Sequence, residues 1–158
     1  MRLTKFTDYS LRVMLHAAAL DKDDLTTIEE TSNIYGISRA HLKKVVLLLI
    51  QTGFLEGVRG RSGGFRLAMH PDQINLGDVI RKTEPDFALA ECFMPGNACR
   101  ITPGCKLPNV MNEALANFIS TFDAYTLVDM LVAPRYFNMP AQSTYPQRGP
   151  KLDNRVQT

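Results

Sequence analysis

The sequence predicts a mainly α-helical fold with one small β-hairpin, and three observations predict it. Apolar residues recur at three- and four-residue steps in several segments, which is the period of an α-helix. Two short segments, 54–58 and 65–68, instead alternate like strands on either side of the glycine-rich run RGRSGG. Serine, threonine, glycine and proline stand where helices are expected to begin and end.

Three helices are expected early in the chain, at residues 3–20, 25–35 and 38–52. Gly36 breaks the periodic pattern between the second and the third of them, and Ser38 is placed to cap the third. A helix, a short turn containing glycine and another helix together form a helix-turn-helix motif. The second and third helices are therefore expected to form this motif.

The two alternating segments that follow predict a β-hairpin whose tip consists of glycine and arginine. The glycines also raise the possibility of a phosphate-binding loop. Such a loop needs a strand before the glycines and a helix that starts at them, and neither context is present. Directly after a helix-turn-helix motif, the hairpin is interpreted as the wing of a winged helix.

Basic residues are concentrated between Gly36 and Arg66, where six Lys and Arg face a single acid, although the whole chain carries a net charge of only +2. This local excess is typical of a surface that binds nucleic acid, although ordinary solvated faces also carry charge runs. The N-terminal end of the third helix normally meets base edges in the major groove. The candidate DNA-binding residues are Ser38, Arg39, His41, Lys43 and Lys44 on this helix and Arg59, Arg61, Ser62 and Gly63 in the hairpin turn.

A second helical region lies after the hairpin. Residues 75–84 predict a short helix ended by Pro85, and Pro108 opens a long helix that is expected to run to about Val132. Its apolar residues are spaced four, three, four and three apart, as in a heptad seam. The seam consists of Met111, Leu115, Phe118, Phe122 and Tyr125. A dimer interface is favoured over packing of this stripe on the helix's own domain.

These patterns divide the chain into four parts. A winged helix-turn-helix domain is expected at 1–84, a cysteine-containing loop at 85–107, a dimerisation helix at 108–132 and a disordered tail at 133–158. The tail contains four of the nine prolines and has no apolar periodicity.

All three cysteines, Cys92, Cys99 and Cys105, lie in the short segment ECFMPGNACRITPGCK, with a Pro-Gly pair in each gap between them. An odd number argues against a disulfide framework. Three thiolates gathered on turns suit a zinc ion or an iron–sulfur cluster, and both need a fourth ligand. We expect the three sulfurs to converge on one centre. No histidine or carboxylate pair stands beside them in a catalytic pattern, so the chain is not expected to be an enzyme.

The bulk composition is that of a soluble globular protein, with 158 residues, 45% hydrophobic and 22% charged. No segment approaches the roughly 18 apolar residues of a membrane span, and the polar N-terminus does not predict a signal peptide. A cytoplasmic location is therefore expected, where thiols stay reduced and available to metal.

With these segments in place, the chain resembles the bacterial winged-helix iron–sulfur regulators. The resemblance rests on MRLTKFTDYSLR, RGRSGGFRL and ECFMPGNACRITPGCKL, which occur in the family's order, and it covers about residues 1–132. It implies a homodimer that binds double-stranded operator DNA and holds an iron–sulfur cluster, 4Fe–4S in preference to 2Fe–2S, on the three cysteines.

The fourth ligand separates the branches of this family. Cluster-biogenesis regulators have a histidine three residues after the last cysteine, where this chain has Pro108, and its three histidines all precede the loop. Nitric-oxide-sensing repressors have an aspartate in the first helix that ligates the cluster of the opposite subunit, and FTDYSLR supplies Asp8 at that place. An acid in a first helical turn is also stabilised by the helix dipole alone.

The resemblance therefore implies a nitric-oxide-sensing repressor that binds a palindromic operator as a homodimer and releases it when its cluster is nitrosylated. The segment CRITPGCKL is similar to that branch, whereas AECF is similar to the iron-responsive branch. Two alternatives remain open: an iron-responsive regulator, and a winged-helix DNA-binding protein with a structural zinc site.

Overall fold

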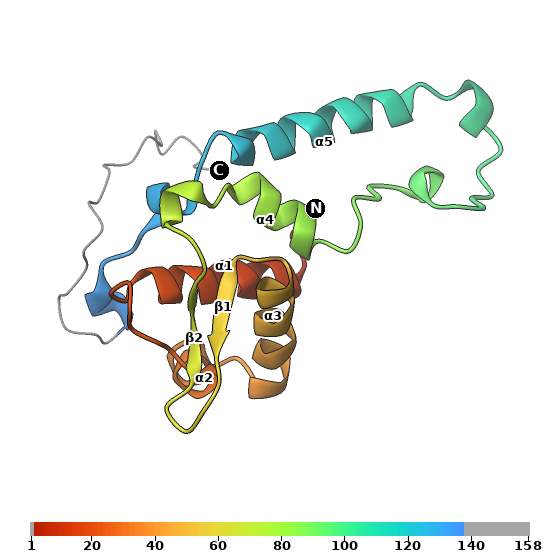
Figure 1. The fold of residues 1–158 in the computed structure, drawn as a ribbon. Helices are drawn as coiled ribbons and strands as arrows, with labels where there is room; N and C mark the ends of the chain where they lie inside the picture. The colour runs from red at the N-terminus through yellow and green to blue at the C-terminus, as the bar shows by residue number, and fades with distance from the viewer. Residues whose placement is uncertain (1, 138–158) are drawn as a thin grey trace.

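The computed structural model describes residues 2–137, and Figure 1 shows a helical body from which a long arm projects. The five α-helices are α1 (Lys5–Ala18), α2 (Ile28–Tyr35), α3 (Arg39–Gln51), α4 (Leu76–Thr83) and α5 (Leu107–Asp123). The two strands are β1 (Leu55–Val58) and β2 (Gly64–Leu67). Short 3₁₀ turns occupy Pro71–Gln73, Glu91–Phe93, Thr102–Gly104, Leu127–Met130 and Pro134–Phe137. The predicted mainly helical fold with one hairpin is confirmed.

The body is built around the faces that α1, α3 and α4 turn inward. Val13 and Met14 of α1, Leu42 and Leu49 of α3 and Val79 of α4 are completely buried. The predicted apolar stripe of α3 forms this core together with both strands. Burying a large aliphatic side chain stabilises a fold by about 1.5–3 kcal/mol, so this cluster holds the helix-turn-helix against the rest of the body.

Side-chain caps fix where the first helices begin. Thr27 and Glu30 form a reciprocal capping box at the start of α2, and the Ser38 hydroxyl accepts a hydrogen bond from the His41 N–H at the start of α3. Gly36 ends α2 with φ 63°, a left-handed conformation that glycine adopts without steric cost. The tight connection between α2 and α3 therefore follows from local chemistry, as predicted.

Strands β1 and β2 pair antiparallel, from Leu55 opposite Leu67 to Val58 opposite Gly64. The hairpin is fastened to the start of the helix-turn-helix by two backbone hydrogen bonds between Thr26 and Phe65, of 3.0 and 2.8 Å. These two hydrogen bonds therefore join the hairpin directly to the residues that precede α2.

The dimerisation helix predicted at 108–132 is wrong at its C-terminal end, because α5 ends at Asp123. The chain then turns, and Thr126 and Asp129 cap a separate 3₁₀ turn that buries Leu127. The heptad spacing continues through Tyr125, but the following apolar residues pack against α1 and the 3₁₀ turn Pro71–Gln73, and this burial bends the chain back to the body.

The predicted disordered tail is also wrong at its start. Pro134–Phe137 forms a 3₁₀ turn in which Pro134 and Phe137 are buried. Phe137 packs against His16, with ring centroids 5.6 Å apart, and against Tyr35 at 6.3 Å. The remainder of the predicted tail, 138–158, lies outside the described residues.

His16 gives the fold a specific pH dependence. Its ring is fully buried, its Nδ1 lies 3.1 Å from the Thr31 hydroxyl, and burial lowers its pKa to about 4 from the ordinary 6.5. Above pH 6.5 neither the folded nor the unfolded chain protonates this ring. As the pH falls from 6.5 towards 4, only the unfolded chain gains the proton, so the free energy of unfolding is expected to fall by about 1.4 kcal/mol per pH unit, or about 3 kcal/mol in total.

Urea unfolding at pH 7.5 and pH 5.5 measures this effect, because most carboxylates remain ionised over that interval. In His16→Leu the difference in unfolding free energy between the two pH values is expected to shrink by more than half. An unchanged difference would show that His16 does not titrate on unfolding.

Candidate functional site

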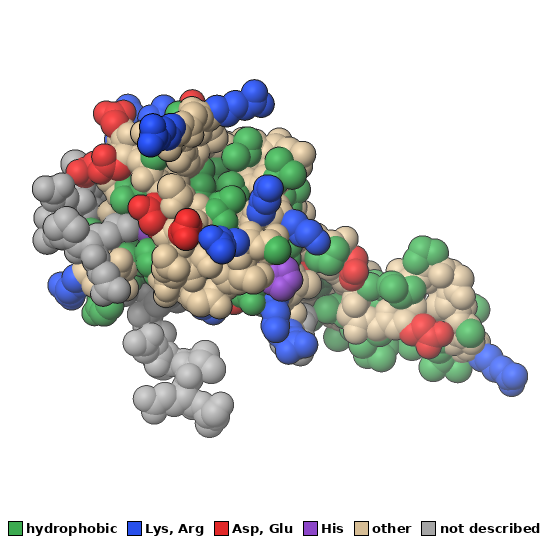
Figure 2. Space-filling view, turned by 90° about the horizontal axis from the view of Figure 1, so that it is seen from below, with side chains coloured by type: hydrophobic (Ala, Val, Ile, Leu, Met, Phe, Trp, Pro, Cys, Tyr) green, Lys and Arg blue, Asp and Glu red, His purple; other side chains and the backbone are tan. Residues whose placement is uncertain are grey.

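The N-terminal half of α3 presents a row of polar and basic side chains to solvent. The residues predicted for this surface are all exposed, namely Ser38, Arg39, His41, Lys43 and Lys44. Their exposure follows from the burial of the opposite stripe, because residues three and four apart share one face of a helix. Figure 2 shows Lys and Arg side chains spread over the side of the molecule seen from below, with hydrophobic side chains between them.

These side chains are held differently. Arg39 pairs with Glu29 at 3.3 Å, but both groups are about 70% exposed, so the pair contributes little and can rearrange around a phosphate. The His41 ring leans towards Tyr9 of α1, with centroids 6.4 Å apart, and lies at the edge of the face. Lys43 and Lys44 occupy its centre.

The hairpin turn carries the second half of the predicted surface. Arg59, Arg61 and Ser62 are exposed. Gly63 is half-buried, and a Cβ at this position would collide with the Val58 carbonyl oxygen, so its role is to close the turn. Figure 1 places this turn and the N-terminal end of α3 at the same end of the body. The hairpin arginines and the α3 lysines can therefore contact one linear partner together; we call these exposed residues the reading surface.

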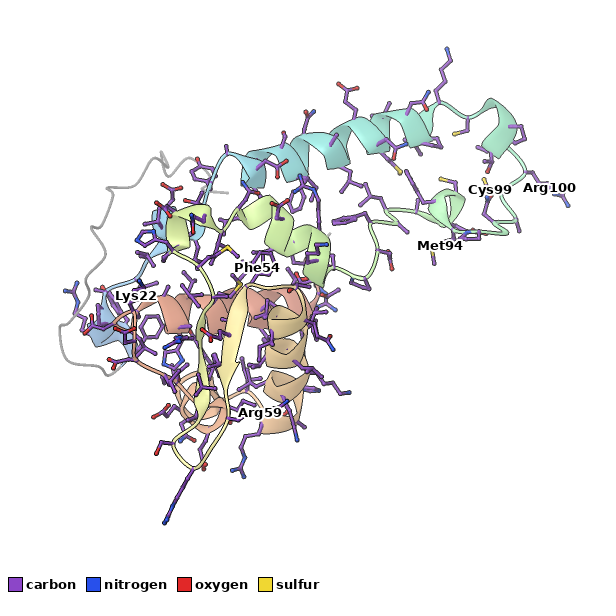
Figure 3. All side chains as sticks on the ribbon, in the orientation of Figure 1. Lys22, Phe54, Arg59, Met94, Cys99 and Arg100 are labelled. Atoms are coloured by element: carbon purple, nitrogen blue, oxygen red, sulfur yellow. The ribbon has the colours of Figure 1, made fainter. Side chains whose placement is uncertain are left out.

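The cysteines lie at the opposite end of the molecule. The loop 85–106 runs out from α4, and α5 returns from its far end, so that together they form the projecting arm (Figure 1). Figure 3 shows Cys99 and Arg100 at the outer end of this arm and Arg59 at the hairpin. Within one chain, the cysteine loop and the reading surface are therefore far apart (Figure 3).

Hydrogen bonds inside the loop bring the neighbours of the cysteines together. The Ala98 N–H donates to the Glu91 carboxylate at 3.1 Å, which joins the residues beside Cys92 and Cys99. The Thr102 N–H donates to the Cys99 carbonyl at 3.3 Å, and the Cys105 N–H donates to the Thr102 carbonyl at 3.4 Å. All three thiols are free. Free thiols are the donor type that soft metals and iron–sulfur clusters take as ligands.

The expected convergence of the three sulfurs on one centre is not present. No group of three Cys, His, Asp or Glu residues within 2–137 is arranged to hold a metal ion. Hydrogen bonds around the cysteines, such as those from Ala98 to Glu91 and from Thr102 to Asn97, run within the loop itself.

Asp8, the predicted fourth ligand, lies on α1 in the body. Its carboxylate accepts a hydrogen bond from Arg12 at 2.9 Å and is about 44% exposed. Within residues 2–137, Asp8 forms no metal-binding group with the cysteines of its own chain.

Helix α5 has no buried residue along its whole length. The predicted seam residues Met111, Leu115, Phe118, Phe122 and Tyr125 are all partly exposed. Phe118 and Phe122 pack edge to face with centroids 5.1 Å apart, and they line a cavity of about 380 Å³ between α5 and the linker 84–89. A helix whose apolar stripe is only partly covered by its own chain is typical of an interaction surface.

Residues 3–133 match the Rrf2 family, which is described as an iron-dependent transcriptional regulator. The chain belongs to the Rrf2 family. It is 48% identical to the HTH-type transcriptional regulator NsrR of Bacillus subtilis strain 168, over 83% of this chain and 90% of that protein. It is 46% identical to the NsrR of Geobacillus kaustophilus, with the same coverage. These relatives are transcriptional regulators, not enzymes.

Solved structures share the Rrf2 fold. The IscR of T. potens superposes with a TM-score of 0.66 at 22% identity, covering 82% of this chain and 85% of that one. The global cysteine regulator CymR of B. subtilis superposes with a TM-score of 0.61 at 21% identity, covering 82% and 95%. No described helix is long and apolar enough to cross a bilayer.

The root of the arm is fixed to the winged helix in this Rrf2 chain. Arg81 of α4 donates to both Asp123 carboxylate oxygens at the end of α5, at 2.6 and 2.5 Å. The Asn75 side chain, which caps α4, donates to the Asp123 carbonyl oxygen at 2.8 Å. At the other end of α4, Glu84 accepts from the Thr4 N–H at 2.7 Å, where α1 begins. Polar contacts therefore link α5 to α4 and α4 to the start of α1.

Sequence reasoning missed this junction. Arg81 and Asp123 are 42 residues apart, and nothing local to either predicts the pair. A signal did exist in the Asn-X-X-Asp cap of α4, where the Asn75 side chain accepts from the Asp78 N–H at 3.1 Å, but it marks only the helix start.

Proposed function

We propose that this chain is a homodimeric repressor that holds an iron–sulfur cluster, senses nitric oxide with it and binds palindromic operator DNA. The observation that carries the proposal is the connected pair of sites: a basic reading surface at one end and three free cysteines on an arm rooted in the same winged helix. The relatives named NsrR, at up to 48% identity, support this branch of the family.

The reading surface suits the duplex. With one winged helix per subunit, two α3 helices would occupy major grooves about 34–36 Å apart or a multiple of that distance. Arg59 and Arg61 at the hairpin turn would reach the flanking minor grooves, where the negative potential is strongest.

The uncovered face of α5 supports a homodimer. A second copy of the same helix would bury the seam from Met111 to Phe122 by heptad packing, whereas Tyr125 of the predicted seam lies beyond the end of α5. A dimer with two-fold symmetry also matches a palindromic site, because each half-site then meets the same surface.

Cys92, Cys99 and Cys105 would hold the cluster, and Asp8 of the partner subunit would complete it. A carboxylate is a harder ligand than a thiolate and binds a sulfur-rich iron site less tightly. Both 4Fe–4S and 2Fe–2S clusters take four protein ligands, and the resemblance to the family implies 4Fe–4S in preference to 2Fe–2S. The separation of the arm from its own α1 supports ligation across the dimer.

The cluster would supply iron that binds nitric oxide in place of protein ligands. Cys92, Cys99 and Cys105 would then no longer restrain the loop, and Asp8 would no longer tie α1 of one subunit to the arm of the other. The Arg81–Asp123 and Glu84–Thr4 contacts would pass the change to the helix-turn-helix. Operator affinity falls because the intact dimer arrangement binds DNA more tightly than the released one.

Asp8→Ala is expected to yield a protein that still binds DNA but loses its cluster faster. The physical reason is the loss of the one ligand that comes from another subunit. Anaerobic decay of the absorbance band near 400 nm in the presence of a chelator measures it, with an expected rate increase of at least about 10-fold, the size typical for loss of a metal-site partner.

The matched control is Asp23→Ala, an exposed aspartate in the α1–α2 turn. Arg12→Ala separates the two roles of Asp8, since it removes the ion pair but keeps the carboxylate. If Asp8→Ala and Asp23→Ala lose the cluster at the same rate, Asp8 is only a helix-terminus acid.

An iron-responsive regulator is the second candidate, because the family is described as iron-dependent. Anaerobic iron, sulfide and zinc analysis of the purified protein tests the cofactor. Iron with equimolar sulfide supports a cluster, and stoichiometric zinc without iron supports a structural zinc site. Release from DNA on iron chelation, with no effect of nitric oxide, would favour the iron-responsive role.

A further inference from the structure

Leu47 is exposed in the middle of the reading helix. Its side chain is 55% exposed, and no other large hydrophobic residue within 2–68 is comparably exposed. On the same helix Leu42 and Leu49 are completely buried. A lone exposed leucine is common on protein surfaces, so its position must carry the argument.

Leu47 lies on the solvent face of α3, about one helical turn beyond Lys43 and Lys44. Ala40, Lys43, Lys44 and Leu47 follow the spacing i, i+3, i+4, i+7, which places them in one strip along a helix. All four are exposed. Along the strip, Ala40 comes first, the two lysines follow, and Leu47 comes last. The strip lies on the side of α3 opposite the buried stripe.

The major groove offers one kind of apolar group at its floor, the C5 methyl of thymine. An apolar side chain beside basic residues is poorly suited to phosphate contacts, but it matches a methyl group flanked by the sugar-phosphate backbone. The leucine side chain extends further from the helix axis than the single methyl group of Ala40. Leu47 is therefore better placed than Ala40 to contact a group at the floor of the groove.

We infer that Leu47 is a specificity-determining residue that recognises a thymine C5 methyl in each operator half-site. The inference rests on the proposed DNA binding and deepens it. The two lysines supply affinity for any duplex, whereas Leu47 distinguishes a thymine from a cytosine or a uracil at one position.

The test uses the full-length, cluster-loaded protein and a duplex that this protein itself selects from a random library under anaerobic conditions. Each thymine of the selected half-site is replaced in turn by deoxyuridine, which keeps the base pair and removes only the methyl group. For the wild type, replacement at one thymine position of the half-site is expected to weaken binding about 4-fold, which corresponds to the burial of one methyl group. Replacement at the other thymine positions is not expected to have this effect.

Leu47→Ala is expected to bind the thymine duplex more weakly and to show no further loss on that same replacement, as a double-mutant cycle requires for a direct contact. Met69→Ala, an exposed apolar residue beyond β2, should retain the full uracil penalty. Thermal unfolding should show both variants folded, since both side chains are exposed.

Two results would overturn the inference. If Leu47→Ala retains the wild-type uracil penalty at every thymine, or if no thymine methyl matters to the wild type, Leu47 does not read the groove while the DNA-binding function stands. If the wild type selects no sequence and binds no duplex, the proposed function fails as well.

Discussion

Replacing Cys99 with alanine is expected to abolish the iron–sulfur cluster and, with it, the response of operator affinity to nitric oxide. Cys99 is the exposed member of the three cysteines and its thiol is free, so its removal costs the fold little. The two remaining cysteines and Asp8 of the partner subunit cannot close a four-ligand site. Anaerobic absorbance near 400 nm and iron and sulfide per chain measure the first effect.

The second effect is measured by operator binding before and after nitric oxide. Cys99→Ala is expected to bind with the weakened affinity of the nitric-oxide-treated wild type, and to show no further change on treatment. Arg100→Ala, its exposed neighbour at the end of the arm, is the matched control and should keep both the cluster and the response (Figure 3). A wild-type cluster content in Cys99→Ala would exclude Cys99 as a ligand.

Lys44→Glu is expected to weaken operator binding by roughly 100-fold or more at about 0.1 M salt, because it replaces attraction to phosphate with repulsion in both half-sites. Lys44 is exposed at the centre of the α3 face, away from the buried stripe. The stability of the fold should not change. Fluorescence anisotropy over a range of salt concentrations measures the affinity, and the salt dependence should become shallower by at least about two counterions per dimer.

Lys22→Glu makes the same charge change at an exposed site in the α1–α2 turn, and Figure 3 shows Lys22 well away from the hairpin arginine Arg59. It is expected to reduce affinity only slightly, through net charge. Equal losses in both variants would mean that the effect is the overall charge of the protein and that α3 is not the reading helix.

The winged helix could be predicted from the sequence because its signals are local. Thr27, Gly36 and Ser38 start or stop helices through contacts with residues a few positions away, and the stripe of α3 needs only its own periodicity. The exposure of Leu47 could be predicted from the same periodicity, because Leu47 falls on the side of α3 opposite the buried stripe.

The end of α5 could not be predicted, because its cause is not local. The heptad spacing continues to Tyr125, and Leu127 turns inward because its segment packs against α1 and the 3₁₀ turn Pro71–Gln73, which are distant in sequence. Phe137 is buried for the same reason, against His16 and Tyr35, in a segment whose composition alone indicates disorder.

The three candidate sulfur ligands could be predicted from the sequence, but their arrangement in space could not. The sequence shows three thiols on turns, and the structure adds the hydrogen bonds that link their neighbours. Full convergence of the sulfurs requires the bound group, and the fourth ligand requires a second chain, so neither follows from one subunit alone.

The most direct measurement is an anaerobic titration of operator DNA with the cluster-loaded protein, before and after nitric oxide, with the absorbance band near 400 nm followed in the same samples. The proposed function predicts that the band is lost or shifted and that affinity falls by about 10-fold or more, within the usual range of coupling between two sites. Unchanged operator affinity after the band has been lost would contradict it.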